Sequence, residues 1–280
     1  MMPSPTVRTL TPDEITELVS WAGNEGWNPG PGDAKAFAAA DPDGFIGCFV
    51  NGTFVAGISA VRYGTDFGFI GLYICRPEHR GKGYGRLVWD AGMAALAGRT
   101  IGLDGVPQQQ ANYASMGFVP AYETVRWSGK PGSIALSGQT QTVANAKLRN
   151  DIVAFDRSYF PGPRTSFLNV WLERPHRARA VLRQEKLAGY GVLRKCLDGY
   201  KLGPLFAQDV EAATALFNDL SHDCGGDAIH IDVPGPQVEF ARHLRQLGFS
   251  AGFTTGRMYR GPVPDLDMSG VFGISTLELG

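Results

Sequence analysis

Short apolar runs alternate with helix-spaced apolar residues along the first half of the chain. Residues 45–50 and 67–74 are apolar runs too short for a helix, which predicts buried strands. Residues 12–22 carry apolar side chains at helical spacing, and Thr11-Pro12 before two acids is a typical helix start. Asn51-Gly52 between two apolar runs predicts a hairpin. The expected elements are mixed α/β: strands at 7–10, 45–50, 53–61, 67–74, 100–104 and 121–128, and helices at 12–22, 34–40, 87–95 and 108–116.

The apolar run at 67–74 leads into a glycine-rich loop. Pro77 ends the strand because proline cannot donate to a sheet ladder, and Arg80-Gly81-Lys82-Gly83-Tyr84-Gly85-Arg86 follows. Such a loop lets backbone N–H groups converge on one point, and the N-terminus of the next helix adds partial positive charge. With three cationic side chains in addition, the stretch predicts a site for a multiply charged anion, most simply a pyrophosphate.

Known phosphate-binding loops differ in the spacing of their glycines, so the spacing in this loop indicates which kind it resembles. The stretch lacks the G-x-x-x-x-G-K-[ST] pattern of nucleoside triphosphatases and the G-x-G-x-x-G pattern of dinucleotide sites. It instead resembles motif A of the GCN5-related N-acetyltransferases (GNAT), [R/Q]-x-x-G-x-[G/A] after a strand. The resemblance implies an α/β (α+β) fold with a mixed, mostly antiparallel twisted sheet flanked by helices. It also implies acetyl-CoA as co-substrate.

The resemblance further assigns roles to single positions. The strand backbone would line the pantetheine arm and the loop would hold the pyrophosphate. The implied set that binds acetyl-CoA is Tyr73, Ile74, Cys75, Arg80, Gly81, Lys82, Gly83, Tyr84, Gly85 and Arg86. Tyr113, shortly before Gly117, matches the family tyrosine that faces the thioester sulfur and protonates the leaving thiolate. The alternative for Tyr113 is a buried aromatic residue with an ordinary hydrogen bond.

Two positions depart from the family pattern. Val106 stands where an asparagine is frequent, so pantetheine contacts on that side are not accounted for. Phe69-Ile70-Gly71 stands where a strand glutamate often serves as general base. The acids available as a general base are then Asp66, at the start of this strand, and Glu123, on the strand at 121–128. The alternative to either residue is removal of the proton through water.

The second half of the chain repeats part of the first. The shared pattern is a strand ending in aspartate, a helix, Gly-Phe and then an arginine: Asp104, Gly117-Phe118 and Arg126 in one half, and Asp232, Gly248-Phe249 and Arg257 in the other. Gly203-Pro204-Leu205 stands where the anion loop should be, and Leu244 matches Tyr113. The second half therefore resembles the degenerate, YitH-like domain of tandem acetyltransferases.

These observations predict two GNAT-like domains in tandem. We expect a catalytic domain at 1–130, a polar, glycine-rich linker at 131–145 and a degenerate domain at 146–280 that shapes the acceptor site. The strand at 121–128 is expected to complete the first sheet. Candidate acceptor-binding residues are Trp27, Asn28, Asp66, Asp156 and Asp232. The alternatives are a plain surface loop for the first two, and capping or interdomain hydrogen bonds for Asp156 and Asp232.

Composition narrows the choice of partners. A net charge of −1 without long charge runs argues against nucleic acid, and no apolar run approaches the ~20 residues of a membrane helix. The four cysteines and five histidines are scattered without metal spacing, so no metal is expected. No signal peptide is visible at the start and the cysteines are expected to be reduced thiols, which predicts a cytoplasmic protein. We expect it to be a monomer or a homodimer.

The resulting functional expectation is N-acetyl transfer. The acetyl group of acetyl-CoA would pass by direct attack to a primary amine of a small molecule, such as an amino acid or a polyamine-like metabolite. Two alternatives remain open: a non-catalytic acyl-CoA-binding sensor or scaffold, and a protein-lysine acetyltransferase, which needs an open groove.

Overall fold

A computed structural model describes residues 4–132 and 134–280, so Met1–Pro3 and Ser133, the latter within the expected linker, lie outside it. The helices are α1 (Pro12–Asn24), α2 (Asp33–Ala40), α3 (Tyr84–Ala95), α4 (Pro107–Ser115), α5 (Ala146–Asp156), α6 (Thr165–Trp171), α7 (Val210–His222) and α8 (Val238–Gln246), with 3₁₀ turns at Pro77–His79 and Met268–Gly270. The strands are β1 (Thr6–Thr9), β2 (Phe45–Val50), β3 (Thr53–Tyr63), β4 (Phe67–Cys75), β5 (Thr100–Gly105), β6 (Val119–Gly129), β7 (Thr140–Thr142), β8 (Arg177–Arg183), β9 (Lys186–Lys195), β10 (Tyr200–Ala207), β11 (Ile229–Pro234), β12 (Ser250–Arg260) and β13 (Val271–Gly273). Among these helices there is none whose length and apolarity would let it cross a membrane.

Two short sequence patterns in the first half, the helix start at Thr11-Pro12 and the turn at Asn51-Gly52, form the structures that they predict. The Thr11 hydroxyl accepts the Glu14 N–H (3.4 Å), and the Glu14 carboxylate accepts the Thr11 N–H (2.8 Å). This reciprocal capping box begins α1, with Pro12 in the first turn where its missing N–H breaks no bond. Asn51 and Gly52 both have positive φ and connect β2 to β3, which is the geometry of a tight hairpin turn. The predicted helix start and hairpin are confirmed.

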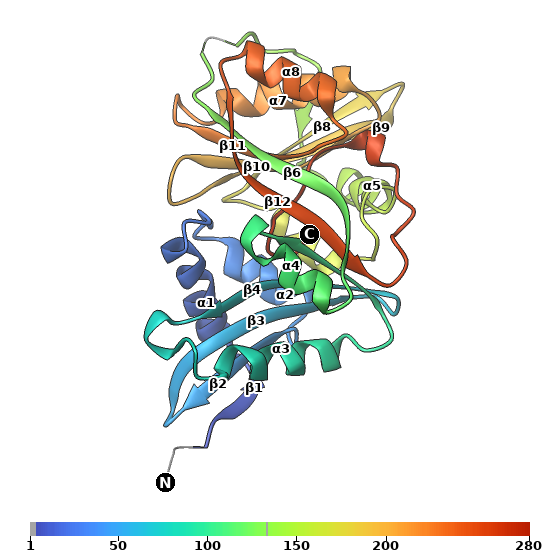
Figure 1. Cartoon of the computed structure of the whole chain (residues 1–280). Coiled ribbons are helices and arrows are strands. Elements are labelled where there is room, and N and C mark those ends of the chain that lie inside the picture. The colour runs from blue at the N-terminus through green and yellow to red at the C-terminus, as the bar shows by residue number, and fades with distance from the viewer. Residues whose placement is uncertain (1–3, 133) are drawn as a thin grey trace.

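One continuous sheet runs through both lobes of the molecule (Figure 1). Its strand order is β1-β2-β3-β4-β5-β12-β6-β11-β10-β9-β8-β7, with β13 paired to β10. Most neighbours are antiparallel, while β4–β5 and β10–β11 are parallel. Helix α3 packs against the first lobe's strands, and α7 against those of the second. The expected mixed, mostly antiparallel sheet flanked by helices is confirmed.

Strands β6 and β12 are exchanged between the two halves. Strand β12 from the second half pairs with β5 of the first, while β6 pairs with β11 of the second half. The two exchanged strands also pair with each other at the middle of the sheet. The expectation that residues 121–128 complete the first sheet is therefore wrong. Because the repeat makes β6 and β12 alike in pattern, local sequence does not decide which sheet each strand joins.

The repeated aspartates and arginines meet across this exchange. Arg257 on β12 lies opposite Asp104 on β5, with both guanidinium–carboxylate contacts at 2.8 Å. Arg126 on β6 lies opposite Asp232 on β11, with contacts of 2.7 and 2.9 Å. Each arginine thus pairs with the aspartate of the other half. Such two-point pairs add geometric specificity, and here they fix the register of the exchanged strands.

Strands β4 and β5 separate beyond Ile70. They pair in parallel only from Phe67–Ile70 to Thr100–Leu103. Leu72 has φ 45°, which is uncommon for a non-glycine residue, and the β3–β4 register shifts at the same place. This β-bulge bends β4 away from β5. In the described part of the chain, the β5-facing edge of residues 71–75 has no strand partner.

The corresponding gap in the second lobe is filled by the chain itself. Strand β10 pairs with β11 only at Tyr200–Leu202, and its register with β9 shifts after Leu202. Strand β13 then pairs with β10 at Leu205 and Phe206. The Ile274 N–H also donates to the Asp232 carbonyl (3.0 Å). This packing supports the expectation that the second half keeps the fold without an acyl-CoA cleft.

The two lobes share an apolar core. It contains residues of α1 and α2 from the first half, and of α5 and α6 from the second. Phe37 of α2 stacks on Trp171 of α6, with ring centroids 6.3 Å apart. Beside them, Asp33 forms an ion pair with Arg194 of β9 (3.0 Å), and both side chains are buried. The lobes are therefore one packed unit.

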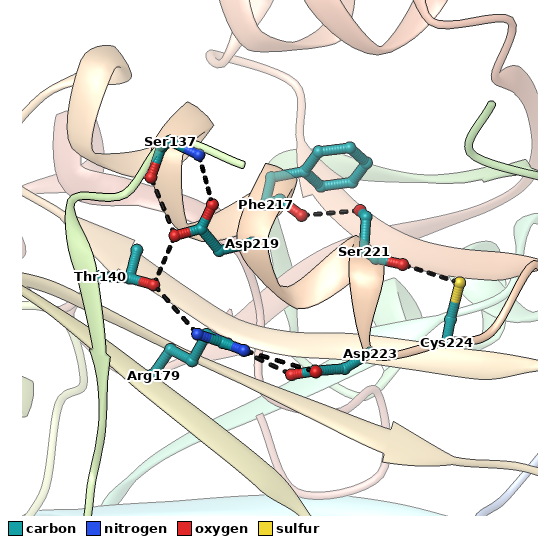
Figure 2. A network of polar contacts seen from close by, with 8 residues as sticks. All are labelled: Ser137, Thr140, Arg179, Phe217, Asp219, Ser221, Asp223 and Cys224. Carbon is teal, nitrogen blue, oxygen red and sulfur yellow. Dashed lines mark hydrogen bonds and ion pairs between the residues drawn. The ribbon is translucent and has the colours of Figure 1, made fainter. Parts of the chain in front are cut away.

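Figure 2 shows how the connection between the halves is held on α7. Asp219 accepts hydrogen bonds from the Ser137 N–H (2.6 Å), the Ser137 hydroxyl (2.9 Å) and the Thr140 hydroxyl (2.6 Å). Burial alone would raise the pKa of Asp219, but these donors outweigh it and lower that pKa. Next to them, Arg179 pairs with Asp223 (3.2 Å). Ser137 and Thr140, which lie in the expected linker, are therefore fixed to α7 by hydrogen bonds.

Candidate active site

A cavity of about 520 Å³ lies where β4 and β5 separate. Its walls are the bulged end of β4, the end of β5 with α4, and the loop after α1. The second half closes it with β12 and with residues 277 and 278 near the end of the sequence. In Figure 1 the C-terminal end lies at the centre of the molecule, between the lobes. Both halves therefore build one site.

The expected strand residues lie along this cavity. Tyr73, Ile74 and Cys75 line it together with Arg80, as the sequence predicted. Their strand edge faces the gap left by β5 and has no strand partner among the described residues, so an extended ligand can pair with it; the Cys75 carbonyl accepts a hydrogen bond from Arg80 (2.9 Å). An extended chain with amide groups can add to such an edge as a strand would.

The glycine-rich loop follows the strand that lines the cavity. Arg80 is on the cavity wall, whereas residues 81–86 are not among the lining residues. Gly81 (φ 75°) and Gly83 (φ 85°) are in the left-handed region, which favours glycine, and a Cβ at either position would meet no atom within 4 Å. Tyr84, Gly85 and Arg86 form the first turn of α3, whose N-terminus has no side-chain cap. These orphan N–H groups and the helix dipole favour an anion.

The cationic side chains of the loop contact nearby groups of the protein. Arg80 donates to the Cys75 carbonyl (2.9 Å) and pairs with Glu25. Lys82 donates to the Glu78 carbonyl (2.9 Å), and Arg86 pairs with Asp90 (2.7 Å). All three are exposed, so these contacts are weak and an incoming phosphate can compete for them.

Tyr113 lies on α4 and faces the same cavity. Its ring stacks on Trp89 of α3 with centroids 5.6 Å apart, and it meets Phe118 edge-on at 6.3 Å. Burial raises the pKa of Tyr113 to about 12, so the phenol keeps its proton at neutral pH. A rigidly held phenol of this kind can donate a proton to a developing anion in the cavity.

Trp27, a candidate acceptor residue, lines the cavity on the side of the loop after α1. Its carbonyl accepts a hydrogen bond from the Lys201 ammonium (2.7 Å). Phe253 and Thr255 of β12 lie on the same wall, and the Thr255 hydroxyl is buried without a hydrogen-bond partner among the described residues. The strand exchange is what brings β12 here.

Four expected acceptor residues lie outside the cavity. The Asn28 amide exchanges two hydrogen bonds of 2.8 Å with the backbone of Asp198, and Asp66 is exposed in the turn before β4. Asp156 is buried in an ion pair with Arg164 (2.7 Å), and Asp232 pairs with Arg126. Asp156 and Asp232 therefore hold the protein together, which was their structural alternative, and Asn28 joins the two halves through hydrogen bonds that the surface-loop alternative did not include.

Glu278 is a cavity residue that the sequence analysis did not identify. It lies far along the chain from the other lining residues, and no motif marks it. The one available signal is an acid between two leucines in an otherwise apolar closing stretch, Leu277-Glu278-Leu279. A charged residue in such a stretch indicates a buried carboxylate, which needs a partner.

Comparisons with known proteins agree with this architecture. A sequence profile of the acetyltransferase (GNAT) family matches residues 13–118, and an acetyltransferase (GNAT) domain profile matches residues 152–273. The holothin acyltransferase of Pseudoalteromonas sp. (strain SANK 73390) is 34% identical over 263 residues, which cover 93% of this chain and 89% of that protein.

Solved structures share the fold of the whole chain. A crystal structure from Pyrococcus horikoshii, described as that of a candidate acetyltransferase, gives a TM-score of 0.84 at 21% identity and covers 99% of this chain and 96% of that one. A tandem GNAT protein from the clavulanic acid biosynthesis pathway gives 0.65 at 15% identity, over 93% and 100% of the two chains. At 21% and 15% identity, these two structures show that the fold is shared and carry no argument about the activity.

Proposed function

Because the chain belongs to the GNAT family of acetyltransferases and is an acyltransferase of this type, we propose that it transfers an acetyl group from acetyl-CoA to a primary amine of a small molecule. The observation that carries the proposal is the open β4 edge, with an anion loop at one end and Tyr113 facing it. Attack by the amine is direct, because the amine and the thioester meet in one cavity.

The cavity suits an acyl-CoA. The pantetheine arm would pair with the edge of Tyr73–Cys75, and the pyrophosphate would lie on the N–H groups of Gly81–Arg86. When bound, the co-substrate supplies the activated acyl group. The strand amides near Ile74 would then stabilise negative charge on the thioester oxygen, as an oxyanion hole does.

The side chains of the protein would hold the amine beside the thioester, and one of them would donate a proton to the leaving sulfur. Holding the amine beside the thioester converts a bimolecular step into an effectively unimolecular one, which accounts for a large part of the rate of such reactions. The Tyr113 phenol donates its proton to the leaving sulfur. Trp27, Phe253 and Thr255 form the acceptor wall.

The partly covered acceptor end supports a small molecule. The second half covers part of the site with β12 and residues 277–278, and this cover favours a small molecule over a protein chain. The relative named for acyl transfer to holothin spans nearly the whole chain, so holothin is a reasonable first acceptor to try.

Calorimetric titration with acetyl-CoA tests the site. We expect Gly83→Leu to abolish measurable binding, since the side chain would project from the anion loop. Gly98→Leu is the matched control, because Gly98 also has positive φ and open space around its Cβ but follows α3, away from the cavity. Equal affinity in both variants would contradict the site assignment.

A further inference from the structure

Glu278 carries a buried carboxylate without a partner. Its side chain is 3% exposed, and neither carboxylate oxygen has a hydrogen-bond partner among the described residues. Burying carboxylate oxygens that accept no hydrogen bond is costly, so a cationic donor is expected to reach them in the working protein. Because Glu278 lines the cavity, that cation can come from the ligand.

The other carboxylates that line the cavity are already paired. Glu25 pairs with Arg80, and Asp104 is held at two points by Arg257. Of the acidic side chains that the described residues place on the cavity wall, this leaves Glu278 as the one available to a substrate.

The backbone holds Glu278 firmly against the first half. A Cβ on Gly71 of β4 would lie 2.0 Å from the Glu278 carbonyl oxygen, so only glycine permits this approach. That carbonyl also accepts the Ser59 hydroxyl (3.3 Å), and the next carbonyl, of Leu279, accepts the Tyr63 hydroxyl (2.9 Å). The carboxylate is thereby fixed beside the strand edge that faces the cavity.

The charged groups around Glu278 do not satisfy it directly. Arg126 and Arg194 lie nearby and pair with Asp232 and Asp33. Arg194 bonds to Asp33 through Nε, and its Nη2 has no hydrogen-bond partner among the described residues, but it makes no hydrogen bond to Glu278. The Lys201 ammonium donates to the Trp27 carbonyl, and burial lowers its pKa although the Glu278 charge acts in the opposite direction. These cations offset the buried charge and leave the carboxylate oxygens free to accept.

We propose that Glu278 binds the ammonium group of the acceptor and accepts its proton, so that the closing segment of the second half supplies a catalytic base to the first. The proposal rests on the proposed acyl transfer. It implies that acceptors are amines that enter as cations, with the Thr255 hydroxyl as a further polar contact.

The protons balance over the whole reaction. One N–H bond of the ammonium breaks and its proton passes to Glu278, which leaves a lone pair on nitrogen. That lone pair forms the C–N bond at the thioester carbonyl, the C–S bond breaks, and sulfur takes its proton from Tyr113. A second N–H proton restores Tyr113, the third stays in the amide, and Glu278 releases its proton to solvent.

Two amines of similar size test this role. Ethylamine is an ammonium ion at neutral pH, whereas 2,2,2-trifluoroethylamine is largely neutral. We expect Glu278→Gln to lower kcat/KM for ethylamine on the order of 10²-fold, and for trifluoroethylamine by less than about tenfold. Glu239→Gln on α8, an exposed acid outside the cavity, is the matched control and should change neither rate.

Three measurements separate this inference from its rivals. An equal loss with both amines, or no loss, would overturn the base role. If Glu278 merely balances Lys201, Glu278→Gln will lower the melting temperature, and Lys201→Met in the same chain will restore both stability and ethylamine turnover. Absence of acetyl transfer by the wild-type protein to either amine or to holothin would instead overturn the proposed function, and the base role with it. Acetyl-CoA affinity should be the same in all these variants.

Discussion

Tyr113 is positioned by aromatic packing against Trp89 and Phe118. We expect Tyr113→Phe to lower kcat on the order of 10²-fold with unchanged acetyl-CoA affinity, because the ring still packs and only the proton is lost. Since the pKa of Tyr113 is raised to about 12, its loss of activity by deprotonation should appear only as the pH approaches that value. Steady-state kinetics of this variant and of Tyr159→Phe, which lies outside the cavity, provide the check. Equal rates in Tyr113→Phe and wild type would remove the acid role.

Gly71 permits the close approach of Glu278 to β4. Gly71→Ala should destabilise the fold by roughly 1–3 kcal/mol, because the new methyl group would overlap backbone atoms of residue 278. Gly252→Ala on β12 is the control, since its Cβ would meet only the Arg126 carbonyl at 3.8 Å. Urea unfolding of the two variants measures the difference. Equal stabilities would show that the closing segment does not pack here in solution.

Single residues were predictable where local pattern defines their role. The succession of strand, glycine-rich loop and helix at residues 67–95 could be predicted, because glycine spacing and apolar periodicity are properties of a short stretch. The sequence left two roles open for Asp156 and Asp232, because the partner of an acid depends on tertiary contacts: Arg164 and Arg126 approach them only in the folded chain. Glu278 was missed for the same reason, since its neighbours Ser59 and Gly71 lie far away in sequence.

At the scale of elements, the start of α1 offers a pH-dependent test. Arg8 and the Thr11 N–H lower the pKa of Glu14 to about 2, below the ~4.3 of an unfolded chain. A carboxyl group with a lowered pKa stabilises the fold above the unfolded value and loses that effect as pH falls through the folded value. Glu14→Gln should therefore cost about 1 kcal/mol at pH 7 and progressively less from pH 4 towards 2. Urea unfolding at pH 7, 4 and 3 measures this, and a pH-independent difference would contradict it.

The strands show where prediction from pattern ends. The hairpin at Asn51-Gly52 and the strand before the glycine loop follow from local signals, and the structure has both. The exchange of β6 and β12 could not be predicted, because both strands carry the same repeat and either could have stayed in its own sheet. The pairing is decided by the whole arrangement, in which Asp104 meets Arg257 and Asp232 meets Arg126.

At the scale of the whole molecule, the two halves should unfold together. They share a core, exchange strands and are joined by the buried Asp33–Arg194 pair, so neither lobe can open without exposing the other. We expect one cooperative transition in calorimetry of the ligand-free protein, with equal calorimetric and van't Hoff enthalpies. Two resolved transitions would show that the lobes are independent.

The same arrangement explains why the function belongs to the whole chain. In the proposed site, the first half supplies the strand edge and Tyr113, while the second supplies residues of β12 and Glu278 to the same cavity. The second half, in which β13 fills the gap beside β10, thus still contributes residues to the cavity of the first.

The most direct test of the central claim is a joint measurement of thiol release and amide product. Purified protein would be mixed with acetyl-CoA and a panel of amines that includes ethylamine and holothin, and free thiol and N-acetylated amine would be quantified together. We predict amine-dependent release with one acetylated amine formed for each thiol. Acetyl-CoA binding without any amine-dependent release would contradict acyl transfer to an amine and would favour a sensor or scaffold.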